Sequence, residues 1–186
     1  MPDIDYGEAV YGLRELQIAP YSAGALGAWM NLPSLTLTYR LIREQAEMRS
    51  NDQVVATTSK VSKVEWDIEA GPFPLEVINA MFGGTLTTTG VSPNEQKTLK
   101  FSVNDETPDF AIRGRAIGGK TPPSSGGGGG GDMVLRLNWC QVTGNLEGSM
   151  QDQNWLSPKI SGVGLEHSTD GLMSVVTRET AAAFAS

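Results

Sequence analysis

Hydrophobic and polar residues alternate along much of the chain, a pattern typical of strands with one buried face. Between residues 34 and 41, leucines and a tyrosine occupy every second position, with threonines and an arginine between them. Between residues 61 and 70, Val64, Trp66 and Ile68 share one face, and acidic residues occupy the other. Further strands are predicted at residues 54–58, 85–89, 98–103, 109–117, 133–142, 159–166 and 172–180.

One segment has helical spacing instead. Pro74 suits the first turn of a helix, Leu75, Ile78 and Phe82 share one face, and two glycines follow as a stop signal. About nine strands and one short helix predict an all-β fold, either a two-sheet β-sandwich or a partly closed barrel flanked by the helix. With 186 residues, the chain is expected to form a single domain over residues 1–186.

Residues 42–53 interrupt the alternation and are rich in both signs of charge. We expect a long projecting hairpin loop here that contacts other subunits. The residues proposed for these contacts are Arg43, Glu44, Glu47, Met48, Arg49 and Asp52.

The two ends of the chain combine apolar residues with weak periodicity. Residues 1–30 are interpreted as an extended N-terminal arm, and residues 181–186 as a C-terminal tail. Apolar termini outside a core element often bind another chain, so Leu13, Leu16 and Phe184 are further contact candidates. Residues 118–131 are rich in glycine and are expected to form a flexible surface loop.

The charge and the rare residue types narrow the possible functions. A net charge of −7 disfavours an external nucleic-acid binder, which needs clustered Lys and Arg. A single cysteine and a single histidine leave few ways to build a disulfide framework, a zinc site or a catalytic triad. The acidic N-terminus resembles neither a secretory signal nor a membrane span, and we expect folding in a reducing compartment.

Glu65, Asp67 and Glu69 are the most suggestive candidates for chemistry. Neighbouring carboxylates on one strand face lie ~6.5–7 Å apart, a spacing compatible with an acid–base pair or a divalent cation. Three like carboxylates in a row, however, share one environment, whereas catalysis needs two different ones. A functional acidic lining and a plain solvated face both remain open, and we predict no catalytic residue, metal or cofactor.

Two other residues are interpreted structurally. Cys140 follows a tryptophan in an apolar strand, as a buried thiol would, and His167 precedes a turn at residues 168–171. The glycine-rich segment leads into a strand and not into a helix, so it does not match a phosphate-binding loop. Trp66 and Trp139 are predicted to be core residues, whereas Trp29 and Trp155 are less constrained.

Several segments, in order, carry a resemblance to a known family. They are YGLRELQI (11–18), EMRSNDQVVATTSKVSKVEWDIEAG (47–71), a short helix ending in FGG before TLTTTG, FAIRGRAIG (110–118) and WCQVTGNLEGSM (139–150). In these segments the chain resembles the major tail tube proteins of long, non-contractile-tailed bacteriophages. The glycine-rich segment is its main departure from that pattern.

The resemblance implies a non-enzymatic structural subunit of the virion tail, assembled in the host cytoplasm. Six copies would close a ring, and rings would stack into a tube that meets the tape-measure, terminator and baseplate proteins. DNA would pass through the lumen during ejection without specific binding, and Glu65, Asp67 and Glu69 are our candidates for the lumen lining. The alternatives are a β-sandwich module that binds carbohydrate or protein, an enzyme that uses the acidic strand, and a tube subunit of a contractile tail or secretion system.

Overall fold

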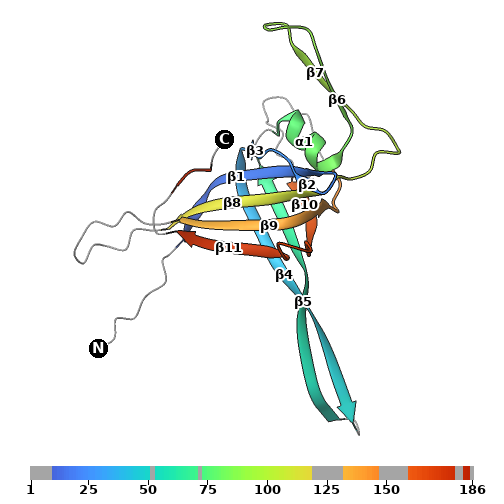
Figure 1. Cartoon of the computed structure of the whole chain (residues 1–186), viewed down its shortest axis with the longest axis vertical. Helices are drawn as coiled ribbons and strands as arrows, with labels where there is room; N and C mark the ends of the chain where they lie inside the picture. Colours follow the sequence, from blue (N-terminus) through green and yellow to red (C-terminus); the bar gives the residue numbers. More distant parts are fainter. Residues whose placement is uncertain are drawn as a thin grey trace, which may run out of the picture.

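A computed structural model describes residues 10–50, 53–70, 73–118, 132–146, 159–178 and 182–184. Most of these residues are in strands, and one helix accompanies them (Figure 1). The elements are β1 (Val10–Ser22), β2 (Ala25–Leu26), β3 (Met30–Leu32), β4 (Ser34–Ser50), β5 (Gln53–Ala70), α1 (Leu75–Phe82), β6 (Thr85–Thr89), β7 (Gln96–Lys100), β8 (Phe110–Gly118), β9 (Asp132–Val142), β10 (Lys159–Leu165) and β11 (Met173–Arg178).

Nine of the strands form one antiparallel sheet that folds over itself into two layers. Strands β1, β8, β9 and β11 make the first layer, with the short β2 and β3 on the outer edge of β1. Strands β10, β5 and β4 make the second layer, which crosses behind the first (Figure 1). Strand β10 is the corner, because it pairs with both β5 and β9. The predicted all-β sandwich with one helix is confirmed, and the barrel is not closed.

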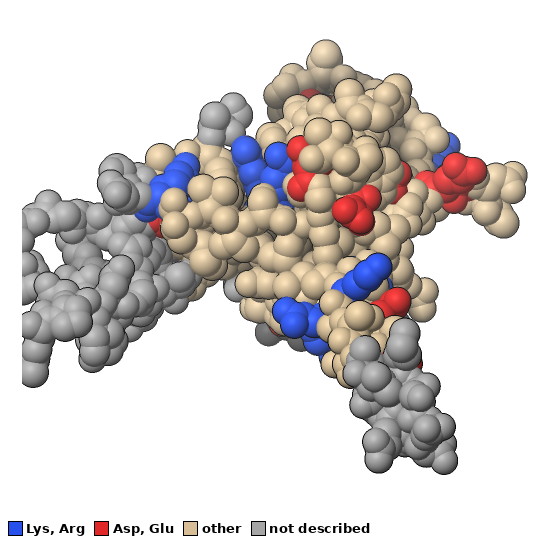
Figure 2. Space-filling view, turned by 60° about the horizontal axis from the view of Figure 1, so that its bottom comes forward, with Lys and Arg blue, Asp and Glu red and all other residues tan. Residues whose placement is uncertain are grey.

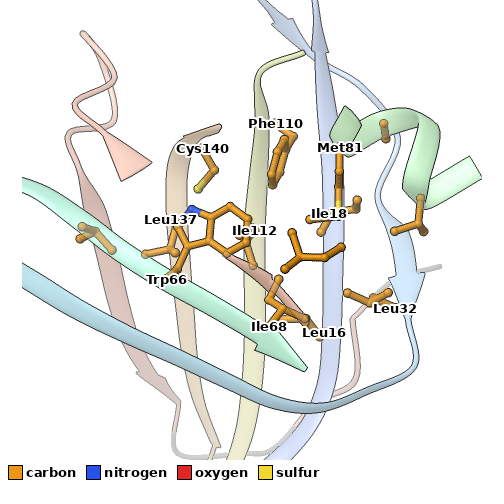
Figure 3. Close-up of a cluster of buried hydrophobic side chains, with 14 residues drawn as sticks. Leu16, Ile18, Leu32, Trp66, Ile68, Met81, Phe110, Ile112, Leu137 and Cys140 are labelled. Carbon is orange, nitrogen blue, oxygen red and sulfur yellow. The ribbon is translucent and has the colours of Figure 1, made fainter. Parts of the chain in front are cut away.

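The hydrophobic core lies between the two layers and under the helix. Trp66 of β5 lies among the labelled side chains of Figure 3 and meets Phe110 of β8 edge-on, with ring centroids 5.7 Å apart. Helix α1 adds Val77, Ala80 and Met81 to this core. The other buried members are Leu16, Ile18, Leu32, Val64, Ile68, Ile112, Leu137, Cys140 and Ile160.

A glycine in the corner strand makes room for Trp66. A Cβ atom placed on Gly162 would lie 2.2 Å from the indole ring of Trp66 and 2.2 Å from the carbonyl oxygen of Gln141. Two residues further along β10, Gly164 has no such conflict, because the nearest atom to its Cβ would be 3.5 Å away. The turn from one layer into the other therefore depends on a residue without a side chain at position 162.

The described part of the predicted loop, residues 42–50 and 53, is in strands instead. Strands β4 and β5 continue through this segment as a two-stranded ribbon, paired from Arg43 with Val61 to Ser50 with Gln53. The ribbon projects from the body of the molecule, as predicted, but as β-structure (Figure 1). The alternation of polar and apolar residues fails here because the described side chains of the ribbon, residues 43–47 and 57–61, are exposed on both faces, so neither face selects apolar residues.

The N-terminal segment is also different from the expected arm. Residues 10–22 form β1, which pairs with nine residues of β8 inside the first layer. Leu16 is 2% exposed and belongs to the core, and Leu13 packs partly buried against it. Register shifts between Tyr11 and Glu15 disturb the period of two, which explains why the strand was missed.

The hairpin β6–β7 stands apart from the main sheet, beside helix α1 (Figure 1). Strand β7 ends at Lys100, earlier than predicted, and Phe101 and Val103 beyond it are exposed. Their alternation with polar residues mimics a strand, but no described part of the chain covers them as a second layer.

Candidate functional site

The predicted acidic face lies on the outer side of β5, in the second layer. Glu65 forms ion pairs with Arg40 of β4 at 2.5 Å and with Lys63 at 3.2 Å. The hydrogen bond from the Arg40 guanidinium, helped by Lys63, lowers the pKa of the Glu65 carboxyl. The carboxylate is therefore neutralised by its neighbours in a partly exposed position.

The strands on either side of β5 place more basic and neutral residues on the same face. Glu69 pairs in register with Lys159 of β10, and Asp67 with Ser161. Three basic residues, Arg40, Lys63 and Lys159, therefore offset the three carboxylates. The face is mixed in charge and not acidic as predicted. On the face of the molecule that Figure 2 shows, Lys and Arg side chains lie near acidic ones in several places. Among the described residues, no group of acidic, histidine or cysteine side chains could hold a metal ion.

Five of the six proposed contact residues of the ribbon belong to β4. Arg43, Glu44 and Glu47 are exposed along the projecting part of β4. Met48 and Arg49 belong to the same strand, and Asp52 lies outside the described residues, as does most of the glycine-rich segment. The ribbon is thus a surface element, with Leu41 and Val61 exposed near its base.

A row of four charged side chains crosses the outer face of the first layer, one from each of its long strands. Arg115 of β8 donates two hydrogen bonds to Glu15 of β1, at 2.8 and 3.0 Å. Arg178 of β11 binds both carboxylate oxygens of Asp132 on β9, at 2.5 Å each, and Arg115 lies 3.4 Å from the same carboxylate. We call Glu15, Arg115, Asp132 and Arg178 the charged row.

The C-terminal segment, residues 182–184, lies on this charged row. The Ala182 N–H donates to Asp132 at 3.1 Å, and the Phe184 N–H donates to Glu15 at 2.9 Å. Arg178 donates in turn to the Ala182 carbonyl at 2.7 Å. The charged row therefore binds the backbone of the segment through two acceptors and one donor.

These contacts move the pKa values of both carboxyl groups. The hydrogen bonds from Arg115 and then from the Phe184 N–H lower the pKa of Glu15. Burial raises the pKa of Asp132, but the hydrogen bonds from Arg178 and the Ala182 N–H outweigh it, and the net shift is downward. Both groups are consequently held as carboxylates.

Phe184 completes this contact through its side chain. The Arg113 guanidinium lies 4.1 Å from the centre of the Trp29 ring and 4.2 Å from that of the Phe184 ring. Gln17 accepts hydrogen bonds from the Arg113 guanidinium and donates one to Asn31, which fixes the guanidinium in place. Phe184 was predicted to contact another subunit, and here it packs on its own chain.

A cluster of three rings lies at the other end of the same face. Tyr21, Trp139 and His167 stack with centroids 5.1–5.7 Å apart, and the Tyr21 hydroxyl donates to the Asn138 carbonyl. Trp139 is half-buried in this cluster, so its prediction as a core residue is wrong. Trp66 is in the core as predicted. Cys140 is buried as predicted, and burial raises the pKa of its thiol.

Sequence reasoning missed the charged row and its bound segment. A signal was present in FAIRGRAIG, where Arg113 and Arg115 alternate with apolar residues in a strand whose other face is buried. Glu15 and Asp132 gave no comparable signal, because their partners are about 100 and 46 residues distant in the chain.

Within the described ranges, no helix is both long and apolar enough to cross a membrane. No protein-family model matches the chain, and no curated protein matches it either.

Proposed function

We propose that this chain is a structural subunit that assembles with copies of itself into a tube, of the kind found in the tails of long, non-contractile-tailed bacteriophages. The observation that carries the proposal is the β4–β5 ribbon. Its described side chains from Arg43 to Glu47 and from Thr57 to Val61 are exposed. About eight residues per strand extend it roughly 26 Å from the body. A two-stranded ribbon is marginally stable alone in water, so a partner surface is expected to receive it.

Two unpaired strand edges give the subunit further means of association. Within the described residues, β4 pairs only with β5, and β11 pairs only with β9. Strand β11 exposes Val175 and Val176, at 49% and 51%, and its pairing with β9 runs without a bulge from Met173 to Arg178. Edges of this kind pair readily with another chain, and joining two different edges of neighbouring copies generates a ring or a filament.

We place the outer face of β5 in the lumen of this tube. Its mixed charges, with Glu65 held between Arg40 and Lys63, would give DNA phosphates neither a strong attraction nor a strong repulsion. Weak contact is what a conduit for sliding DNA needs. Reversing Glu65, Asp67 and Glu69 to lysine is expected to permit assembly and to slow DNA ejection, and unchanged ejection kinetics would refute the lumen role.

The assembly proposal is tested by shortening the ribbon. Residues 45–59 are replaced by Asn-Gly, which joins Glu44 to its register partner Lys60 through a tight hairpin turn. Negative-stain microscopy and sedimentation compare this variant with the wild type at the highest soluble concentration. We expect rings or filaments from the wild type and a folded monomer from the variant, because the described side chains among the residues removed, 45–47 and 57–59, are exposed.

A substitution that keeps the ribbon intact provides the matched control. Val91→Ser changes an exposed apolar residue on the β6–β7 hairpin, away from the ribbon. We expect it to assemble like the wild type. A wild-type chain that stays monomeric, or a shortened variant that forms normal tubes, would contradict the proposal.

A further inference from the structure

The outer face of the first layer has the properties of a peptide-binding site, and the chain's own C-terminal segment occupies it. We propose that this site accepts the C-terminal segment of a second copy, so that two subunits can be joined by exchanging their tails. Recognition of a peptide at this site does not depend on tube formation.

The site recognises the backbone of the tail segment, residues 182–184. Asp132 and Glu15 accept the N–H groups of Ala182 and Phe184, which are two residues apart. In an extended chain, residues i and i+2 point their N–H groups to the same side, so two fixed carboxylates can accept both. Asp132 is 2% exposed and held by two arginines, which makes it a preorganised acceptor.

The site also recognises one side chain. The Arg113 guanidinium lies over the Phe184 ring at 4.2 Å and also over the Trp29 ring at 4.1 Å. Contact of a cation with an aromatic ring favours Phe, Tyr or Trp at this position over aliphatic residues. The ligand class is therefore an extended peptide with an aromatic residue two positions after its first anchored N–H, as in the Ala-Ala-Phe of the tail.

The position of the site favours a second copy as the source of the segment. Arg178 binds both Asp132 and the Ala182 carbonyl, and it is the last residue of β11, the strand with an open edge and exposed valines. A copy that pairs along this edge would bring its own chain next to the charged row. The tail of the same chain has a high effective concentration, so exchange is expected where copies are crowded or where the resident tail is missing.

The first experiment measures peptide binding. A chain lacking residues 182–186 is titrated with a fluorescent peptide of residues 180–186, and binding is followed by anisotropy. We expect saturable binding, at least tenfold weaker binding to the full-length chain, whose own tail competes, and at least tenfold weaker binding of the peptide with Phe184→Ala. A folded truncated chain that ignores the peptide, or that binds both peptides equally, would overturn the proposal.

A second acceptor covers the possibility that truncation prevents folding. The full-length chain with Phe184→Ala keeps its backbone contacts but vacates the aromatic contact with Arg113. It is expected to bind the wild-type peptide more tightly than the unmodified chain does, and equal binding would count against the site.

Exchange between subunits is tested with a complementary pair. The acceptor lacks residues 182–186, and the donor keeps its tail but carries Glu15→Ala, which removes the acceptor of the Phe184 N–H while Arg115 retains Asp132. We expect a one-to-one complex in sedimentation only when the two are mixed, and its loss when the donor also carries Phe184→Ala. No complex, in the presence of peptide binding, would refute exchange. Failure to form tubes would leave these results unaffected.

Discussion

Asp132 provides the sharpest test of how the first layer is held together. Its carboxylate is fully buried, accepts hydrogen bonds from Nε and Nη2 of Arg178 at 2.5 Å each, and lies 3.4 Å from Arg115. Asp132→Asn keeps the shape of the side chain and removes the charge. Breaking a buried ion pair costs about 3–5 kcal/mol, and we expect about 3 here because Arg115 keeps Glu15 and Arg178 reaches solvent. In a chain of this size, that loss lowers the Tm by roughly 6–12 °C.

The pH dependence of the free energy of unfolding distinguishes a contribution of this ion pair from a contribution of packing alone. The pKa values of Asp132 and Glu15 are lowered in the folded chain, so the unfolded chain binds more protons in acid. Their stabilisation is present above the ordinary carboxyl pKa of about 4 and is lost as the pH falls through the lowered values. The free energy of unfolding, measured in urea between about pH 6 and 3, should therefore fall more steeply for the wild type than for Asp132→Asn.

A matched substitution on the other layer makes this result interpretable. Glu69→Gln removes a carboxylate from an exposed position and should change the free energy of unfolding by less than about 0.5 kcal/mol. If Asp132→Asn were as mild as Glu69→Gln, or if it kept the full pH dependence of the wild type, the charged row would not stabilise the fold as we describe.

The corner strand and the buried thiol give two further tests. Gly162→Ala should destabilise the chain by about 1–3 kcal/mol in urea unfolding, because its Cβ would overlap Trp66 and the Gln141 carbonyl. Gly164→Ala is the control and should cost clearly less, so equal effects would refute the close approach at position 162. Cys140 should react with a thiol reagent only as fast as the chain opens, because burial shields it and raises its pKa. Rapid reaction of the native chain would contradict its placement.

The bound tail controls access to the outer face of the first layer. Residues 182–184 cover Arg113 and part of the charged row, so the state of the tail determines whether this face is open. The β4–β5 ribbon and the open edge of β11 are available in either state. Assembly through the ribbon and exchange of the tail are therefore separable, and the variants above address each alone.

The alternation of residue types by itself determined much of the secondary structure. Val64, Trp66 and Ile68 were assigned to one buried face of a strand, and the helix was placed close to its observed bounds of Leu75–Phe82. These elements have one face in the core and the other in solvent, so the local sequence records their geometry. The burial of Cys140 followed from the same local signal.

Tertiary structure alone decided the rest. The described side chains of the ribbon are exposed on both faces, and β1 contains register shifts, so neither segment has a clean period of two in its sequence. The charge of the β5 face depended on which strands flank it, since Lys159 comes from a distant part of the chain. Glu15, Asp132 and Arg178 meet because β1, β8, β9 and β11 lie side by side, an order set by strand pairing across the whole chain. The tail-binding site is built from those long-range neighbours, and no local pattern could have revealed it.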